Sequence, residues 1–189
     1  VALVCAIGAF AIYSKQEVFA PMKDKKMLVK YALAGLLITV NWSIYIWAVN
    51  AGFVIQTSIG YYIEPLVVCT FGIVLFKEKL NKYKVIALAF AVIGVAAVIL
   101  YFKEIPLIAL GVALTFAVYA AAKKNFSLPP IISLFYETIF LVPIALAAII
   151  YFECTGQGAL SVGQSHKLVL LMLCGFVTAL PLGLFANAT

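Results

Sequence analysis

The chain has 189 residues, of which 66% are hydrophobic and only 11% are charged, whereas about a quarter of the residues in soluble domains are charged. The formal net charge of +6 rests on 13 lysines and no arginine, so bidentate arginine contacts with phosphates or bases are excluded, and nucleic acid is not an expected partner. This composition excludes an ordinary soluble domain and predicts an all-α integral membrane protein whose main solvent is lipid.

Six apolar runs come close to the roughly 20 residues that a helix needs to cross about 30 Å of hydrocarbon. They cover residues 28–48, 57–76, 85–102, 105–122, 131–152 and 168–189. A seventh run, residues 1–13, is too short to cross alone. We therefore expect a polytopic helical bundle with about seven helices, cut inside a helix at both ends.

The lysines predict the orientation of this bundle. Eleven of the 13 lie in or beside three alternate connections, residues 14–27, 77–84 and 123–130. Connections rich in Lys and Arg stay in the cytoplasm. We therefore expect these three connections to be cytoplasmic.

Two acidic residues lie inside apolar runs, where a carboxylate near the bilayer centre costs about 2.5 to 3.5 kcal/mol. The deeper one is Glu64, and Gln56, Thr57, Gly60 and Tyr61 precede it at helical spacings. Such a polar stripe is expected to face the bundle or a cavity.

Pro65 follows Glu64 directly and has no N–H for the carbonyl group of Tyr61, so we expect a kink beside the carboxyl group. A kink and a carboxylate at mid-depth are typical of a gated binding site. The alternative is a structural Glu64 that is protonated and hydrogen-bonded to a neighbouring helix.

Glu137 is expected about 9 Å into its run from the cytoplasmic end, at 1.5 Å per residue. Tyr136 and Thr138 flank it, and Pro143 follows. The same reasoning makes Glu137 a candidate for binding a solute or a coupling ion. In the alternative, its side chain extends to the membrane surface or pairs with Lys123 or Lys124.

Asn41 and Tyr45 lie one turn apart in the second run. Hydrogen bonds between helices are the default interpretation of such polar residues, and ligand binding is the minority hypothesis. Trp42, Tyr45, Tyr61 and Tyr62 together would suit an aromatic solute, although packing between helices explains these aromatic residues equally well.

Residues for enzymatic chemistry are sparse. His166 is the only histidine, and the four cysteines form no Cys-x-x-Cys pair. No catalytic triad, metal site, disulfide or phosphate-binding loop is indicated. We expect no cofactor and no enzymatic activity.

Several separated motifs resemble one family. They are Asn41–Trp42, Ile46–Asn50, Gly60–Leu66 (GYYIEPL), Leu75–Leu80 (LFKEKL) and the run from Glu137 to Pro143 (ETIFLVP). In this order they resemble the RarD branch of the EamA transporters, within the drug/metabolite transporter superfamily. The resemblance covers the whole chain.

The resemblance implies ten helices in two inverted repeats of five, with both termini in the cytoplasm. Residues 1–103 would hold helices two to five of the first repeat, and residues 104–189 the first three helices of the second. Glu137 matches the family motif. At the position of Glu64, directly before Pro65, the family usually has Asn. A role for Glu64 is therefore not implied by the resemblance.

The sequence and the resemblance together predict a secondary active transporter of a small organic solute, such as a metabolite or a chloramphenicol-like drug. We expect alternating access coupled to protons or cations, in the inner membrane of a bacterium. The expected partners are the solute and the lipid bilayer, and homodimer assembly is left open. An integral membrane enzyme and a non-transporting membrane scaffold are the alternatives.

Overall fold

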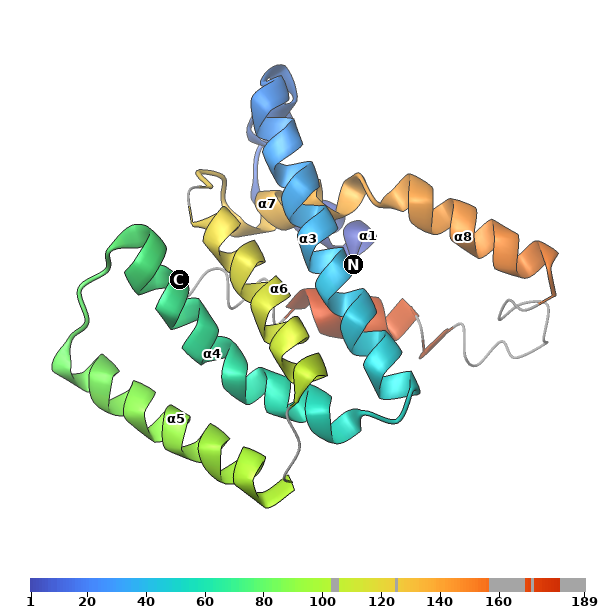
Figure 1. Cartoon of the computed structure of the whole chain (residues 1–189). Helices are drawn as coiled ribbons and strands as arrows, with labels where there is room; N and C mark the ends of the chain where they lie inside the picture. Colours follow the sequence, from blue (N-terminus) through green and yellow to red (C-terminus); the bar gives the residue numbers. More distant parts are fainter. Residues whose placement is uncertain (103–105, 125, 157–168, 171, 181–189) are drawn as a thin grey trace. The chain divides into compact units, whose positions relative to one another are not determined.

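The computed structural model describes residues 1–102, 106–124, 126–156, 169–170 and 172–180, and over these residues it is helical, with no strand (Figure 1). The predicted all-α class is thereby confirmed. The elements are α1 (Ala2–Ile12), α2 (Lys15–Phe19), the 3₁₀ helix η1 (Ala20–Lys23), α3 (Lys25–Asn50), α4 (Val54–Phe76), α5 (Lys82–Phe102), α6 (Leu107–Lys123), α7 (Pro130–Ile139) and α8 (Val142–Cys154).

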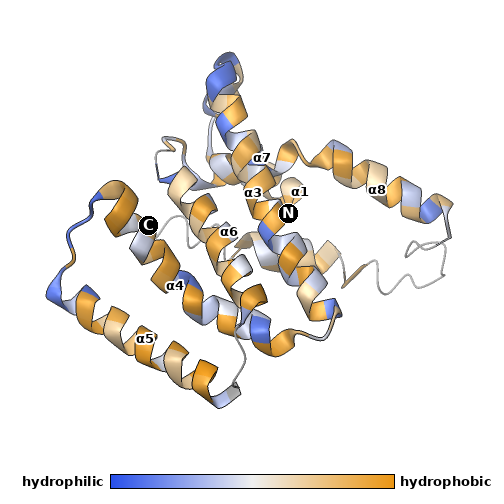
Figure 2. Ribbon diagram, in the orientation of Figure 1, coloured by the Kyte–Doolittle hydropathy of each residue, from blue (hydrophilic) through white to orange (hydrophobic). Residues whose placement is uncertain are grey.

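Three of these helices, α3, α4 and α5, are long and apolar enough to cross a membrane, and α7 with α8 would add a fourth, bent crossing. Apolar residues cover their surfaces on most sides, and polar residues gather near the connections (Figure 2). A helix that is apolar all round is buried in protein or in lipid. The described part of the chain is thus that of a multi-pass helical membrane protein.

The runs predicted at the two ends of the chain and at residues 105–122 do not correspond to membrane-length helices in the described residues. The run at residues 1–13 is the short helix α1, and the run at 105–122 is α6, which has 17 residues. Half of the run at 168–189 lies outside the described residues, and its described residues, 169–170 and 172–180, are helical. The proposed repeat boundary at residues 103–104 also lies outside them.

The run at 131–152 is not the single straight helix that hydropathy predicts. It is divided into α7 and α8, which are bent by 46° at a short break. Pro143 lies in the first turn of α8 and has no N–H to donate to the carbonyl group of Ile139, where α7 ends. The proline therefore accounts for the position of the break.

Two compact units make up the chain, and each is described by itself. The first comprises residues 1–36 and 127–189, and in it α1 packs against α7. The rings of Phe10 and Phe135 meet edge to face at 6.2 Å. The first part of α3 also belongs to this unit.

The second unit comprises residues 37–126, and in it α4 packs against α5 and α6. The contact with α6 is close because Gly60 has no side chain: a β-carbon there would lie 3.4 Å from the α-carbon of Ala109. The hydrophobic core cluster at this contact consists of Ile59, Ile63, Ala109 and Ala113.

Candidate functional site

Glu137 lies on α7 with 1% of its surface exposed. The hydroxyl group of Ser133, one turn earlier and also buried, donates a hydrogen bond of 2.7 Å to Oε1 of Glu137. The side chain therefore does not extend to the protein surface. The carboxyl group is held inside the first unit.

Three helices of that unit meet around Glu137. Cys5 on α1 and Tyr31 on α3 are both buried in this unit. Gly35, one turn after Tyr31, faces the Glu137 backbone so closely that a β-carbon would overlap the carbonyl oxygen. The ring of Tyr136 lies 6.3 Å from that of Tyr31, and its hydroxyl group donates a 2.8 Å hydrogen bond to the carbonyl group of Val18.

Glu64 belongs to the second unit, on α4, and is half-buried. Tyr61 lies one turn earlier on the same helix. The rings of Tyr45 and Tyr61 meet edge to face with centroids 5.5 Å apart, and 54% of the Tyr61 surface is exposed. The structure thus brings together three of the six predicted site residues, Tyr45, Tyr61 and Glu64.

Glu64 differs from other carboxylates in its bonding. Within the part of the chain that the structure describes, its carboxyl group has no hydrogen bond and no ion pair. Glu17 accepts from Ser14, Asp24 accepts from the backbone of Lys26, and Glu78 pairs with Lys124. A half-buried carboxyl group thus lies on a membrane-length helix.

Two other residues of the polar stripe before Glu64, Gln56 and Gly60, contact α6. The side-chain oxygen of Gln56 accepts a 3.4 Å hydrogen bond from the N–H of Ile108. Thr57 is buried, with its hydroxyl group donating to the carbonyl group of Val54, and Gly60 packs on Ala109. Helix α4 continues through Pro65.

Asn41 serves a packing role in the second unit. Its buried amide group donates hydrogen bonds of 2.8 Å to the carbonyl group of Val112 and 2.9 Å to the hydroxyl group of Thr115, both on α6. Both amide hydrogens are therefore used between helices, which favours the default interpretation over ligand binding. Trp42, the next residue on α3, is half-buried.

Lys124 has a different partner from the one considered in the sequence. It forms an ion pair with Glu78, and its ammonium group lies 4.1 Å from the centre of the Phe76 ring. The hydrogen bond from Lys124 lowers the pKa of the Glu78 carboxyl group below its usual range. Sequence reasoning missed this pair, since the two residues are 46 positions apart. It also missed Ser133, although the four-residue spacing to Glu137 is visible in the sequence.

Metal chemistry finds no support among the described residues, because they contain no group of three or more His, Cys, Asp or Glu side chains able to hold a metal ion. His166 lies outside the described residues.

Comparisons with known proteins identify the family. Residues 1–100, more than half of the chain, match the EamA-like transporter family. The chain belongs to this family. The resemblance to its RarD branch is confirmed by a relative in Salmonella typhi called "Protein RarD", which is 34% identical over 169 residues, 88% of this chain and 57% of the relative.

Two further proteins are similar to this chain. The "Uncharacterized transporter YojE" of Bacillus subtilis is 42% identical over 88% of this chain and 55% of its own length. The "Chloramphenicol-sensitive protein RarD" of Pseudomonas aeruginosa is 28% identical over 83% of this chain and 52% of its own length. The chain thus spans about half the length of the curated relatives it matches. No solved structure matches the chain.

Proposed function

We propose that the complete protein is a secondary active transporter of a small organic solute, working by alternating access and coupled to protons or cations. The observation that carries this proposal is the pair of carboxyl groups, Glu137 and Glu64, on apolar helices. Ionisable residues inside a membrane are expensive, and they typically mark pathways for substrates and ions. Membership of the EamA-like transporter family supports the same conclusion.

Glu137 is the residue that we assign to coupling. It lies two residues before the end of α7, and the chain then bends by 46° into α8. Broken helices leave backbone groups free at membrane depth, and transporters use such breaks at sites for substrates and coupling ions. A buried carboxyl group beside a break is suited to bind and release a proton or cation as the repeats move.

Tyr45, Tyr61 and Glu64 are the residues that we assign to the solute. Two tyrosine rings and a half-buried carboxyl group suit a solute with an aromatic or cationic part. The name of the Pseudomonas aeruginosa relative adds chloramphenicol to the solutes to be tested.

The proposal includes the architecture implied by the family. Residues 1–103 form helices two to five of a first inverted repeat, and residues 104–189 open a second. The lysine-rich connections 14–27, 77–84 and 123–130 face the cytoplasm of a bacterial cell. The protein resides in the inner membrane.

Solute flux in vesicles tests the transport function. The complete protein is reconstituted, and uptake and efflux of a solute panel, including chloramphenicol, are followed across an imposed pH gradient. Glu137→Gln and Glu64→Gln are compared separately with the wild type. Asp24→Asn is the matched control, because it removes a charge outside the apolar helices while Asn keeps the helix cap that Asp24 supplies.

The expected result is wild-type flux that follows the gradient, flux that no longer does so in Glu137→Gln, and altered solute affinity in Glu64→Gln. Asp24→Asn should behave as the wild type. If the wild type moves no solute from a broad panel, transport itself is refuted. If Glu137→Gln stays fully coupled, only the assignment of coupling to Glu137 fails.

A further inference from the structure

The connection between α1 and α3 contains an open recess of about 550 Å³ lined by Lys15, Gln16, Phe19, Ala20 and Lys23. We call it the Lys15–Lys23 recess. Helices α2 and η1 form its walls, and α3, a helix long enough to cross a membrane, begins two residues after Lys23. The recess therefore lies at one end of a membrane span.

The backbone under the recess is fixed by specific contacts. Ser14 and Glu17 form a capping box at the start of α2, in which the Ser14 N–H donates to Glu17 at 2.9 Å. Val18 is fully buried, and its carbonyl group accepts the hydrogen bond from Tyr136. Pro21 is also buried. The recess is thus anchored to the first unit while its lysine side chains stay exposed.

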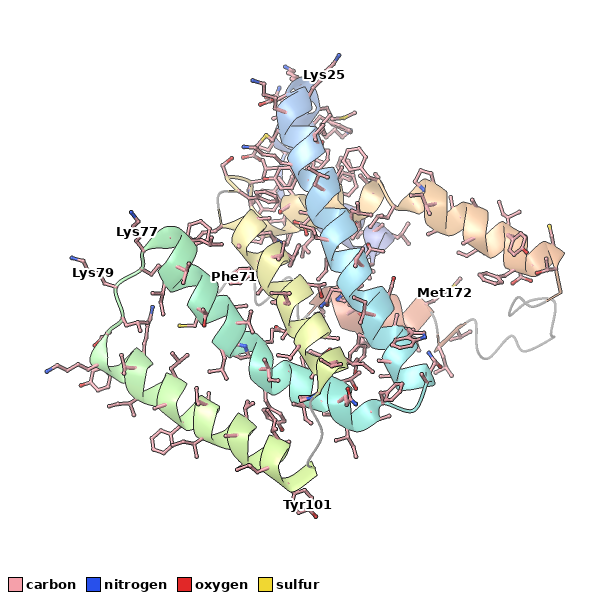
Figure 3. All side chains as sticks on the ribbon, viewed as in Figure 1. Lys25, Phe71, Lys77, Lys79, Tyr101 and Met172 are labelled. Atoms are coloured by element: carbon pink, nitrogen blue, oxygen red, sulfur yellow. The ribbon has the colours of Figure 1, made fainter. Side chains whose placement is uncertain are left out.

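The charge in the recess is positive. Its lining includes two lysines and an amide but no carboxylate. The two acidic residues of the segment have hydrogen-bond partners outside the recess lining. Glu17 accepts from Ser14, and Asp24 accepts from the backbone N–H groups of Lys26 and Met27. The side chain of Lys25 extends away from the same end of α3 (Figure 3). A phosphate group would meet ammonium donors here without a competing carboxylate.

Exposed apolar side chains accompany these lysines. Phe19 is 47% exposed and Met22 is 57% exposed, and the Phe19 ring packs at 5.6 Å against Phe10 of α1. A segment with apolar side chains beside lysines lies in the interfacial layer, with its charged groups among lipid headgroups. A soluble anion would leave the apolar side chains unused, whereas a phospholipid engages both.

We propose that the Lys15–Lys23 recess binds the phosphate headgroup of an anionic phospholipid, with Lys15 and Lys23 on the phosphate and with Phe19 and Met22 among the upper acyl chains. The bound lipid fixes the connection between α1 and α3 at the membrane surface. This site does not depend on the transport function.

Native mass spectrometry of the complete protein in detergent tests the site. The protein is titrated with dioleoyl phosphatidylglycerol, with dioleoyl phosphatidylcholine and with inorganic phosphate. Lys15→Gln with Lys23→Gln is the test variant. Lys79→Gln with Lys82→Gln is the matched control, since it removes the same charge from another exposed connection. Lys15→Arg with Lys23→Arg checks that a loss comes from charge and not from misfolding.

Each lysine near an anionic surface contributes about fivefold to affinity, so the test variant should bind phosphatidylglycerol about 30-fold more weakly. The control and arginine variants should stay within about twofold of the wild type, and phosphatidylcholine should bind weakly throughout. The proposal is overturned if the test variant binds phosphatidylglycerol normally, or if the control variant weakens binding equally. Inorganic phosphate binding as tightly as the lipid would instead identify a site for free anions and would also overturn it.

Discussion

Gly35 on α3 lies directly against the carbonyl oxygen of Glu137 on α7, so that a β-carbon at residue 35 would overlap that oxygen. The two helices cross here backbone to backbone, as small residues permit in membrane proteins. The position of the Glu137 carboxyl group therefore depends on a residue that carries no functional group.

Gly35→Ala should displace α7 and destabilise the protein by about 1 to 3 kcal/mol, as overpacking does, and coupled flux should fall with it. The readouts are the melting temperature in detergent and flux in vesicles. Gly94→Ala is the control, because among the described residues no atom beyond the adjoining backbone of α5 lies within 4 Å of the β-carbon it would add. That change should be neutral or stabilise the helix by up to about 1 kcal/mol. Equal effects at both positions would contradict the close contact.

Ser133→Ala should destabilise the protein by about 1 to 3 kcal/mol, because it removes the 2.7 Å hydrogen bond to the buried Glu137 carboxyl group. Ser133→Thr keeps the hydroxyl group and should retain most of the stability. The double variant Ser133→Ala with Glu137→Gln should not show the sum of the single effects, since the two residues share one interaction. If the change in melting temperature of the double variant equals the sum of the two single changes, the hydrogen bond contributes nothing to stability.

The Glu78–Lys124 ion pair should make stability depend on pH and salt. The pair lowers the pKa of Glu78, so its contribution is present above the ordinary carboxyl pKa of about 4.3 and is lost as pH falls through the lowered value. Both side chains are substantially exposed, 46% for Glu78 and 39% for Lys124, so the contribution is small and salt screens it. The difference in melting temperature between wild type and Glu78→Gln should shrink at low pH and at 1 M salt.

Cys69 offers a second measurement of this ion pair. It lines a crevice of about 140 Å³ between α4 and α6, together with Glu78 and Lys124. In a variant with the other three cysteines replaced by serine, Glu78→Gln should speed the reaction of Cys69 with a maleimide. The exchange Glu78→Lys with Lys124→Glu should restore the slow rate. An unchanged rate in Glu78→Gln would show that the pair does not hold the two helices together.

Hydropathy predicted the long helices well because lipid requires every backbone group to be bonded within its own helix. The runs at 28–48 and 57–76 differ from α3 and α4 by at most three residues at each end. The break before Pro143 was missed because hydropathy does not register a lost backbone hydrogen bond, although the proline itself was visible.

The candidate site was predictable as a set of residues but not as an arrangement. Carboxyl groups in apolar runs identify Glu64 and Glu137 without a structure. The contact of Tyr45 with Tyr61, and that of Asn41 with Val112, join different helices. Such contacts depend on how helices pack, which the periodicity of a single helix does not contain.

Asn41→Ala should separate a packing role from a ligand role. The variant loses two hydrogen bonds to α6, and because such bonds in membranes average about 0.6 kcal/mol each, the protein should lose about 1 kcal/mol of stability. The apparent affinity for a transported solute should stay nearly unchanged. Asn50→Ala is the control, since the exposed Asn50 amide bonds only to Ile46 of its own helix among the described contacts. The opposite result would be a large fall in solute affinity for Asn41→Ala at an unchanged melting temperature. It would assign Asn41 to solute binding, because the loss of a contact between helices lowers the melting temperature.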